Sequence, residues 1–223
     1  PLLQALSGEE PRSPAPHHFL GVAYAKKGDL PQAVQELKTV IELAPNAIES
    51  HAVLASVYLT QGSADLALEQ AQAVLRLNPR SVQAATIMGE AYLRKNETAK
   101  AGQVFESIVK VAPNHEIAHH RLGLIARSNK NPVEALAHFE QALKAKPDFI
   151  EPLAQIATIK ASQGKLAEAR DRIKQHRELV PKNPLVYNLL GQLFTATKEY
   201  DQAEASFKQA IALNDAILES YTG

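Results

Sequence analysis

The chain has 223 residues, and its 24 lysines and arginines balance its 24 aspartates and glutamates. This balance argues against a nucleic-acid sheath or a polybasic membrane surface, because both need an excess of positive charge. The absence of cysteine and tryptophan excludes disulfides, thiolate metal sites and cysteine nucleophiles, and it leaves few aromatic rings for stacking on bases.

A proline recurs every 34 residues along the chain. A fixed period between 20 and 50 residues is the signature of a repeat architecture, in which one small unit is stacked many times. The prolines are Pro11, Pro45, Pro79, Pro113, Pro147 and Pro181. An alanine keeps the same phase at Ala33, Ala67, Ala101, Ala135, Ala169 and Ala203.

Within the first unit the apolar residues fall three and four apart, as they do on one face of a helix. Leu20 and Tyr24 belong to a first stripe, and Ala33 and Leu37 belong to a second. The segment around Gly28 is predicted to end one helix and cap the next. The proline that closes the period stops the second helix. Each unit is therefore predicted to form a helix–turn–helix hairpin.

The predicted elements begin with residues 1–13, read as the last helix of a preceding repeat. Six full units follow, at 14–47, 48–81, 82–115, 116–149, 150–183 and 184–217. Residues 218–223 are expected to open a further repeat. Neither end shows the polar capping helix that usually closes an array. We therefore expect the chain to be a window on a longer array.

The residues at these fixed places resemble the tetratricopeptide repeat family, whose pattern includes Leu-Gly, an aromatic residue, Ala-x3-Phe and Pro over 34 residues. Leu122-Gly123 holds the first of these places. Ala101-x3-Phe105, Ala135-x3-Phe139 and Ala203-x3-Phe207 match the third. The resemblance covers nearly the whole chain and extends to long bacterial arrays. It implies an all-α, right-handed superhelical solenoid of six full repeats, with partial repeats at both ends.

In that family the first helices of successive repeats line a concave groove, which usually holds a peptide or a helix. The resemblance therefore implies a groove lined by one face of each first helix. The residues at those places are His18, Val22, Lys26, Glu49, Ala52, Ser56, Thr60, Gln83, Thr86, Glu90, Arg94, His120, Leu124, Arg127, Ala154, Thr158, Asn188, Gln192 and Thr195.

Two familiar ligand chemistries of the family are not matched by these residues. Chaperone-binding members grip a C-terminal carboxylate with Lys, Asn and Arg, but the corresponding places here include His18, Ala52 and Thr86. Members linked to glycosyltransferases carry a ladder of asparagines. In this chain only Asn188 stands close to such a place. The groove is expected to be mildly polar and partly apolar. Its charged island is formed by Glu90, Arg94 and Arg127, of which Glu90–Arg94 also fits an ordinary i,i+4 pair.

The segment from His115 to His119 matches H-E-x-x-H, in which two histidines bind zinc and Glu116 activates a water. The repeat phase favours another interpretation. His119 occupies the recurrent aromatic place, which His17 and His51 hold in other units. A packing imidazole explains all three, so no metal or other cofactor is predicted. A zinc hydrolase stays a remote alternative.

The fourth and fifth units depart from the pattern. Ala126 and Lys160 stand where tyrosine is expected, and His176 replaces a small residue of the second helix. A buried ammonium must be paired, neutral or extended towards water. These departures predict a locally loosened interface, with a hinge or a polar binding spot as the alternative interpretation.

The function predicted from these patterns is a non-catalytic protein–protein interaction scaffold that binds a peptide or helical segment of a partner in its groove. The alternative is an architectural spacer that associates with itself within a larger protein. No nucleic-acid partner is expected. No signal peptide, lipidation motif or membrane-spanning run is apparent, so no direct membrane insertion of this stretch is expected. A cytoplasmic parent and a periplasmic or cell-envelope parent are both compatible with the sequence.

Overall fold

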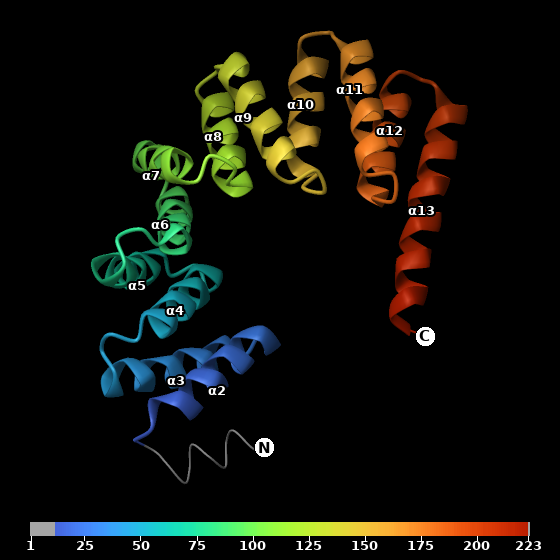
Figure 1. Ribbon diagram of the computed structural model, residues 1–223. Helices are drawn as coiled ribbons and strands as arrows, with labels where there is room; N and C mark the ends of the chain where they lie inside the picture. Colours follow the sequence, from blue (N-terminus) through green and yellow to red (C-terminus); the bar gives the residue numbers. More distant parts are fainter. Residues whose placement is uncertain (1–11, 223) are drawn as a thin grey trace. The chain divides into compact units, whose positions relative to one another are not determined.

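The computed structural model describes the backbone of residues 12–222 and the side chains of residues 12–214. Every regular element in this part of the chain is an α-helix, and consecutive helices pair into antiparallel hairpins (Figure 1). The chain divides between Ala112 and Pro113 into two compact units. The predicted preceding helix at 1–13 lies almost wholly outside the described residues.

The first unit contains three hairpins and the second unit contains three more. The hairpins of the first unit are α2 (Pro14–Lys27) with α3 (Leu30–Leu43), α4 (Ile48–Thr60) with α5 (Ala64–Leu77), and α6 (Val82–Arg94) with α7 (Thr98–Val111). Those of the second unit are α8 (Glu116–Ser128) with α9 (Pro132–Ala145), α10 (Glu151–Ser162) with α11 (Leu166–Leu179), and α12 (Pro184–Ala196) with α13 (Tyr200–Thr222). We number them as hairpins one to six.

The turn inside each hairpin has the same backbone geometry. One residue adopts a left-handed conformation, with φ between 58° and 84°. The next N–H donates to the carbonyl five residues earlier at 2.9 Å, as in a Schellman motif. Glycine meets the positive φ without strain, yet Lys130 and Lys198 adopt it too. The left-handed residues are Gly28, Gly62, Asn96, Lys130, Gly164 and Lys198, which are 34 apart.

The two helices of a hairpin cross at small residues. Ala33, Ala67, Ala101, Ala135 and Ala169 are all fully buried. In four hairpins a glycine on the first helix faces a large side chain on the second. A Cβ added to Gly123 would lie 2.5 Å from the ring of Phe139, and one added to Gly89 would lie 2.6 Å from the ring of Phe105. The absence of a side chain at these glycines therefore sets how closely the helices approach.

Hairpin five departs from this arrangement. Ala157 and Ile173 stand at its crossing, and α10 and α11 approach each other along less of their length than the helices of the other hairpins. Lys160, which replaces the expected tyrosine, pairs with Glu168 of α11 at 2.9 Å. The ammonium group of Lys160 is therefore paired. Pairing is one of the three states expected for it, the others being neutral and extended towards water. The hydrogen bond from Lys160 lowers the pKa of Glu168.

The last helix crosses the predicted start of a further repeat. Helix α13 runs from Tyr200 to Thr222, so residues 218–222, which were expected to open a new unit, continue the helix. In the other units a proline closes the period, but here Asp215 stands at that place. Aspartate keeps its backbone N–H, so the helical hydrogen bonds continue.

We predict that Gly123→Ala destabilises the protein by up to about 2 kcal/mol. Alanine alone would favour the helix by about 1 kcal/mol, but the added methyl group meets the buried ring of Phe139, and overpacking costs about 1–3 kcal/mol. Urea denaturation of both proteins measures the difference. The double variant Gly123→Ala/Phe139→Leu should lose less than the sum of the two single changes. A gain in stability from Gly123→Ala would contradict the close crossing.

Candidate functional site

The first helices of the hairpins in the first unit form one face. Helix α4 contacts both α2 and α6, so these three helices lie next to one another. The second helices α3 and α5 each contact the first helix of the following hairpin. Side chains on the outward side of α2, α4 and α6 therefore share a surface.

A groove of about 610 Å³ lies on this face. Its apolar lining includes Val22 and Leu30 near α2, together with Val53 and Val57 of α4. Its polar lining comes from side chains of α2, α4 and α6. These are Lys26, Ser56, Thr60 and Gln83, all of which the sequence had placed on the groove.

The hydroxyl groups on this face have a common orientation. Ser56 donates to the carbonyl oxygen of Ala52 at 3.1 Å, and Thr60 donates to that of Ser56 at 3.0 Å. Thr86 of α6 donates to its own helix in the same way. A hydroxyl has one hydrogen, so each of these oxygens can only accept a further hydrogen bond. Ser56 and Thr60 therefore present acceptors to the groove, whereas Lys26 and the amide nitrogen of Gln83 can donate.

Other predicted residues of the first unit lie around this groove without lining it. His18 is half-buried, and its Nδ1 lies 2.8 Å from the hydroxyl of Ser50 in α4. Glu49 and Arg94 are exposed, and Glu90 is partly buried. The members of the predicted charged island, Glu90, Arg94 and Arg127, are divided between the two units.

In the second unit most of the predicted groove residues are accessible. Thr158, Asn188, Gln192 and Thr195 are exposed, whereas Leu124 is partly buried. Arg127 donates a hydrogen bond to the amide oxygen of Gln155 in α10. The hydroxyls of Thr158 and Thr195 donate to carbonyls of their own helices, as in the first unit.

His120 differs from what the sequence led us to expect. Its side chain is only 8% exposed and packs against the rings of Phe139 and Phe149, with ring centroids 5.8 and 4.9 Å away. Burial, with a smaller contribution from the charge of Arg121, lowers the pKa of His120 to about 4. The imidazole is a neutral core group and is not available to a ligand on the surface.

Two of the histidines at the recurrent aromatic place, His51 and His119, each make two structural contacts. Nε2 of His51 donates to the carbonyl of Pro45, and Nε2 of His119 donates to that of Pro113, both at 2.9 Å. Their Nδ1 atoms meet side chains 19 residues later, at Gln70 and His138. Because a carbonyl only accepts, Nε2 must carry the proton. These imidazoles tie the inter-repeat loop to both helices of a hairpin.

The H-E-x-x-H segment is used in the same structural way. His115 is the N-cap of α8, where its Nδ1 accepts a hydrogen bond from the N–H of Ala118 at 3.1 Å. His119 is engaged by Pro113 and His138. Among the described residues, no group of three His, Cys, Asp or Glu side chains is placed to hold a metal.

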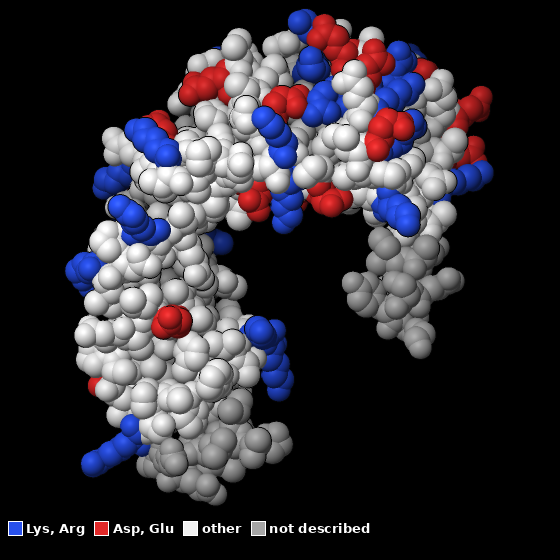
Figure 2. Space-filling view, in the orientation of Figure 1, with Lys and Arg blue, Asp and Glu red and all other residues white. Residues whose placement is uncertain are grey.

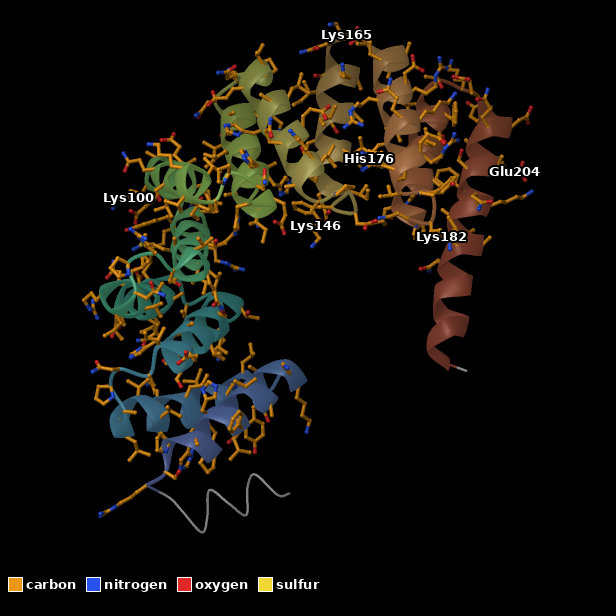
Figure 3. The ribbon with its side chains drawn as sticks, in the orientation of Figure 1. Lys100, Lys146, Lys165, His176, Lys182 and Glu204 are labelled. Carbon is orange, nitrogen blue, oxygen red and sulfur yellow. The ribbon has the colours of Figure 1, made fainter. Side chains whose placement is uncertain are left out.

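His176 has a role that the sequence did not reveal. Leu153 occupies the recurrent aromatic place in hairpin five and cannot donate to the preceding proline carbonyl. His176 lies on α11 (Figure 3). Its Nε2 donates to the Pro147 carbonyl instead, at 2.7 Å. Burial lowers the pKa of His176 against the effect of this hydrogen bond. The sequence does carry a signal of this exchange. In the same hairpin, Leu153 replaces the recurrent aromatic residue and His176 replaces a small residue of the second helix.

Charged side chains are unevenly distributed over the visible face. They crowd over α8–α13 and are sparse over α2–α7 (Figure 2). Many of those in the second unit are engaged with one another, as in the two-fold contact of Arg172 with Glu140 at 2.8 and 2.6 Å. No described helix is both long enough and apolar enough to cross a bilayer.

Models of one family match the chain over most of its length. Three models described as tetratricopeptide repeat match the chain: one at residues 53–116 and again at 103–148, a second at 126–193 and a third at 185–216. A model described as TPR repeat matches residues 21–62. No curated protein matches the chain.

Solved structures of similar fold come from several proteins. PilF of Pseudomonas aeruginosa is 21% identical, with a TM-score of 0.70 over 89% of this chain and 90% of its own. A MamA protein is 24% identical, with a TM-score of 0.63 over 74% and 90%. YrrB, described as having an unusual peptide-binding site, is 15% identical, with a TM-score of 0.60 over 82% and 95%. At these identities the likeness shows the fold alone.

We predict that the protein loses stability as the pH falls from about 6.5 to about 4. His120 is neutral in the fold but has a pKa near 6.5 when unfolded, so in this window the unfolded chain binds the extra proton. The loss should reach about 3 kcal/mol, measured by urea denaturation across the pH range.

The control for this prediction is His120→Leu. Nε2 of His120 is buried without a hydrogen-bond partner among the described atoms, so an apolar side chain is tolerated there. The variant should show a smaller fall in stability over the same pH window. An unchanged pH dependence in His120→Leu would show that other groups cause it.

Proposed function

The chain belongs to the tetratricopeptide repeat family, and we propose that the face formed by its first helices binds a peptide segment of a partner protein. Proteins of this family generally act as protein-interaction scaffolds, and their fold is typically non-catalytic. YrrB, which shares the fold, is described as having a peptide-binding site. These likenesses support a binding role for the chain without naming its partner.

The groove of the first unit is the observation that carries the proposal. It is concave, it measures about 610 Å³, and it combines an apolar lining with a few polar side chains. Binding sites for small segments and ligands have this composition. The histidines that would support a hydrolase are engaged elsewhere, because His115 caps its own helix and His119 donates to the Pro113 carbonyl of the inter-repeat loop. The geometry therefore favours binding over catalysis.

We predict that Ser56→Arg abolishes peptide capture. The long charged side chain fills the groove and buries its charge against Val53 and Val57, which a neutral peptide cannot compensate. Selection of displayed random dodecapeptides on the wild-type protein should enrich binders, whose affinity for Ser56→Arg should fall at least about tenfold.

Two further variants make this experiment decisive. Gln72→Arg adds the same charge on the exposed side of α5, away from the groove, and should leave binding unchanged. Thr60→Arg changes an exposed residue of the groove lining, and it replaces Ser56→Arg in the experiment if that variant folds poorly. Selected peptides that bind Ser56→Arg and Thr60→Arg as well as the wild type would place the site elsewhere.

Self-association is a second candidate function, favoured by an apolar surface in the second unit. Two hollows of about 720 and 470 Å³ share Pro184, Leu185 and Asn214. Leu179 and Ile211 line one hollow each, and both are more than half exposed. A cluster of exposed large apolar side chains often marks an interaction surface.

We expect the double variant Leu179→Glu/Ile211→Glu to remain monomeric at concentrations where the wild type associates, because the new carboxylates repel and would be buried at the contact. Sedimentation velocity over a wide concentration range measures this. Val133→Glu is the control, since Val133 is 77% exposed on α9 and lines neither hollow. A wild type that stays monomeric throughout would contradict self-association through this surface.

A further inference from the structure

A trough of about 330 Å³ lies over α12 in the second unit, between the second helices α11 and α13. Helix α12 contacts both of these helices and lies between them (Figure 1). The residues that line the trough line neither the groove of the first unit nor the two apolar hollows. Sites for small organic molecules begin at about 300 Å³, so the trough can hold one such molecule.

The floor of the trough offers little surface to a ligand. Leu190 and Phe194 of α12 line it, but they are only 2% and 4% exposed. The accessible lining is largely polar and forms two walls, Lys174 and Arg177 on α11 and Gln202, Ser206 and Gln209 on α13. A ligand in the trough is therefore held mainly by polar contacts with these walls.

The wall on α11 is positively charged, and none of the described residues that line the trough is acidic. Nζ of Lys174 lies 5.6 Å from the centroid of the Phe194 ring, and it forms no ion pair with another described residue. Asp171, one turn earlier on α11, lies 3.8 Å from Arg170 instead. The charge of Lys174 is therefore open to an anion from outside the protein.

Arg177 adds a second cation one turn further along this wall. Its Nε and Nη2 contact Oε1 of Glu178, at 3.2 and 2.6 Å. Nη1 takes no part in that contact, so its N–H groups can donate to the same anion as Lys174.

The opposite side of the trough offers acceptors. Ser206 donates its hydroxyl hydrogen to the carbonyl of Gln202 at 2.7 Å, and Tyr187 of the lining donates its own to the carbonyl of Pro181 at 3.0 Å. Each of these hydroxyl oxygens can therefore only accept. The side-chain nitrogen of Gln202 donates to Glu199 at 2.9 Å, and its amide oxygen is a further acceptor.

A ligand that satisfies both sides carries a negative charge towards α11 and hydrogen-bond donors towards α13. Hydroxyl groups are such donors and add no charge. An ammonium group would instead place a further positive charge beside Lys174 and Arg177. The edge of an extended peptide presents carbonyl oxygens together with its N–H groups, so it meets these acceptors less well.

We propose that this trough binds a small hydroxyl-bearing organic anion, the chemistry shared by sugar acids and sugar phosphates. Its carboxylate or phosphate lies against Lys174 and Arg177, and its hydroxyls donate to Gln202 and Ser206. The proposal goes beyond the peptide binding proposed for the first unit, because it concerns other helices and another class of ligand.

The test titrates glucuronate into the whole chain, followed by the backbone amide signals of residues 202–209 in NMR. Glucose lacks the charge, and cyclohexanecarboxylate keeps the charge and the ring size but lacks the hydroxyls. We expect saturable shifts with glucuronate and an affinity at least about threefold higher than for either control, since each control loses one set of hydrogen bonds. Glucose 6-phosphate, titrated in parallel, supports a sugar phosphate if it binds more tightly than glucuronate and a sugar acid if it binds less tightly.

Charge variants connect this binding to the wall on α11. Lys174→Gln keeps most of the side-chain stem and should lower the affinity for glucuronate at least about threefold. Lys144→Gln removes the same charge from an exposed position on α9 that lines no part of the trough, and it should leave the affinity unchanged. Arg177→Gln replaces Lys174→Gln if that variant folds poorly. Equal losses in Lys174→Gln and Lys144→Gln would overturn the proposed site.

A double variant tests the acceptors. Gln202→Met/Ser206→Ala keeps α13 helical but removes both side-chain acceptors, and it should reduce the affinity for glucuronate to that for cyclohexanecarboxylate. The proposal is overturned if glucuronate gives no saturable shifts at residues 202–209, or if the wild type binds cyclohexanecarboxylate as tightly as glucuronate. Peptide capture by the first unit is measured separately, so the two proposals can fail independently.

Discussion

The close crossing of two helices at small residues is the constraint on which this structure depends. Fully buried alanines such as Ala33 and Ala135 let the helices of a hairpin approach, and glycines such as Gly123 admit a large ring from the second helix. Within each unit, successive hairpins also bury their apolar faces against one another. The first helices of the first unit thereby lie next to one another, which leaves their outward sides free to form a groove.

The fold could be predicted from the sequence because its determinants repeat. The 34-residue period located the hairpins, and the left-handed turns keep the same phase even where Lys130 replaces glycine. The feature that recurs at these turns is the backbone hydrogen bond at 2.9 Å, and this bond forms whatever side chain the residue carries. This explains why Lys160 is tolerated in place of tyrosine: its carbonyl makes that bond while its ammonium reaches Glu168.

The candidate site was less predictable, because helical phase gives the direction of a side chain but not what covers it. His120 has a groove-facing phase, yet Phe149 from the α9–α10 loop packs against its ring. The use of His176 also depends on a contact between distant positions, since Leu153 leaves the Pro147 carbonyl without a donor from the usual place. Such contacts between loops and helices are not encoded in a single-residue pattern.

The inter-repeat carbonyls and the groove hydroxyls follow one rule, which links stability to binding. Most buried polar groups find a partner within the protein, and here the imidazoles of His51 and His119 satisfy the carbonyls of Pro45 and Pro113. On the groove face, Ser56 and Thr60 commit their hydrogens to their own helix and keep lone pairs free. Because these hydroxyls are bonded to α4 itself, the helix sets both the spacing and the direction of the lone pairs that face the groove.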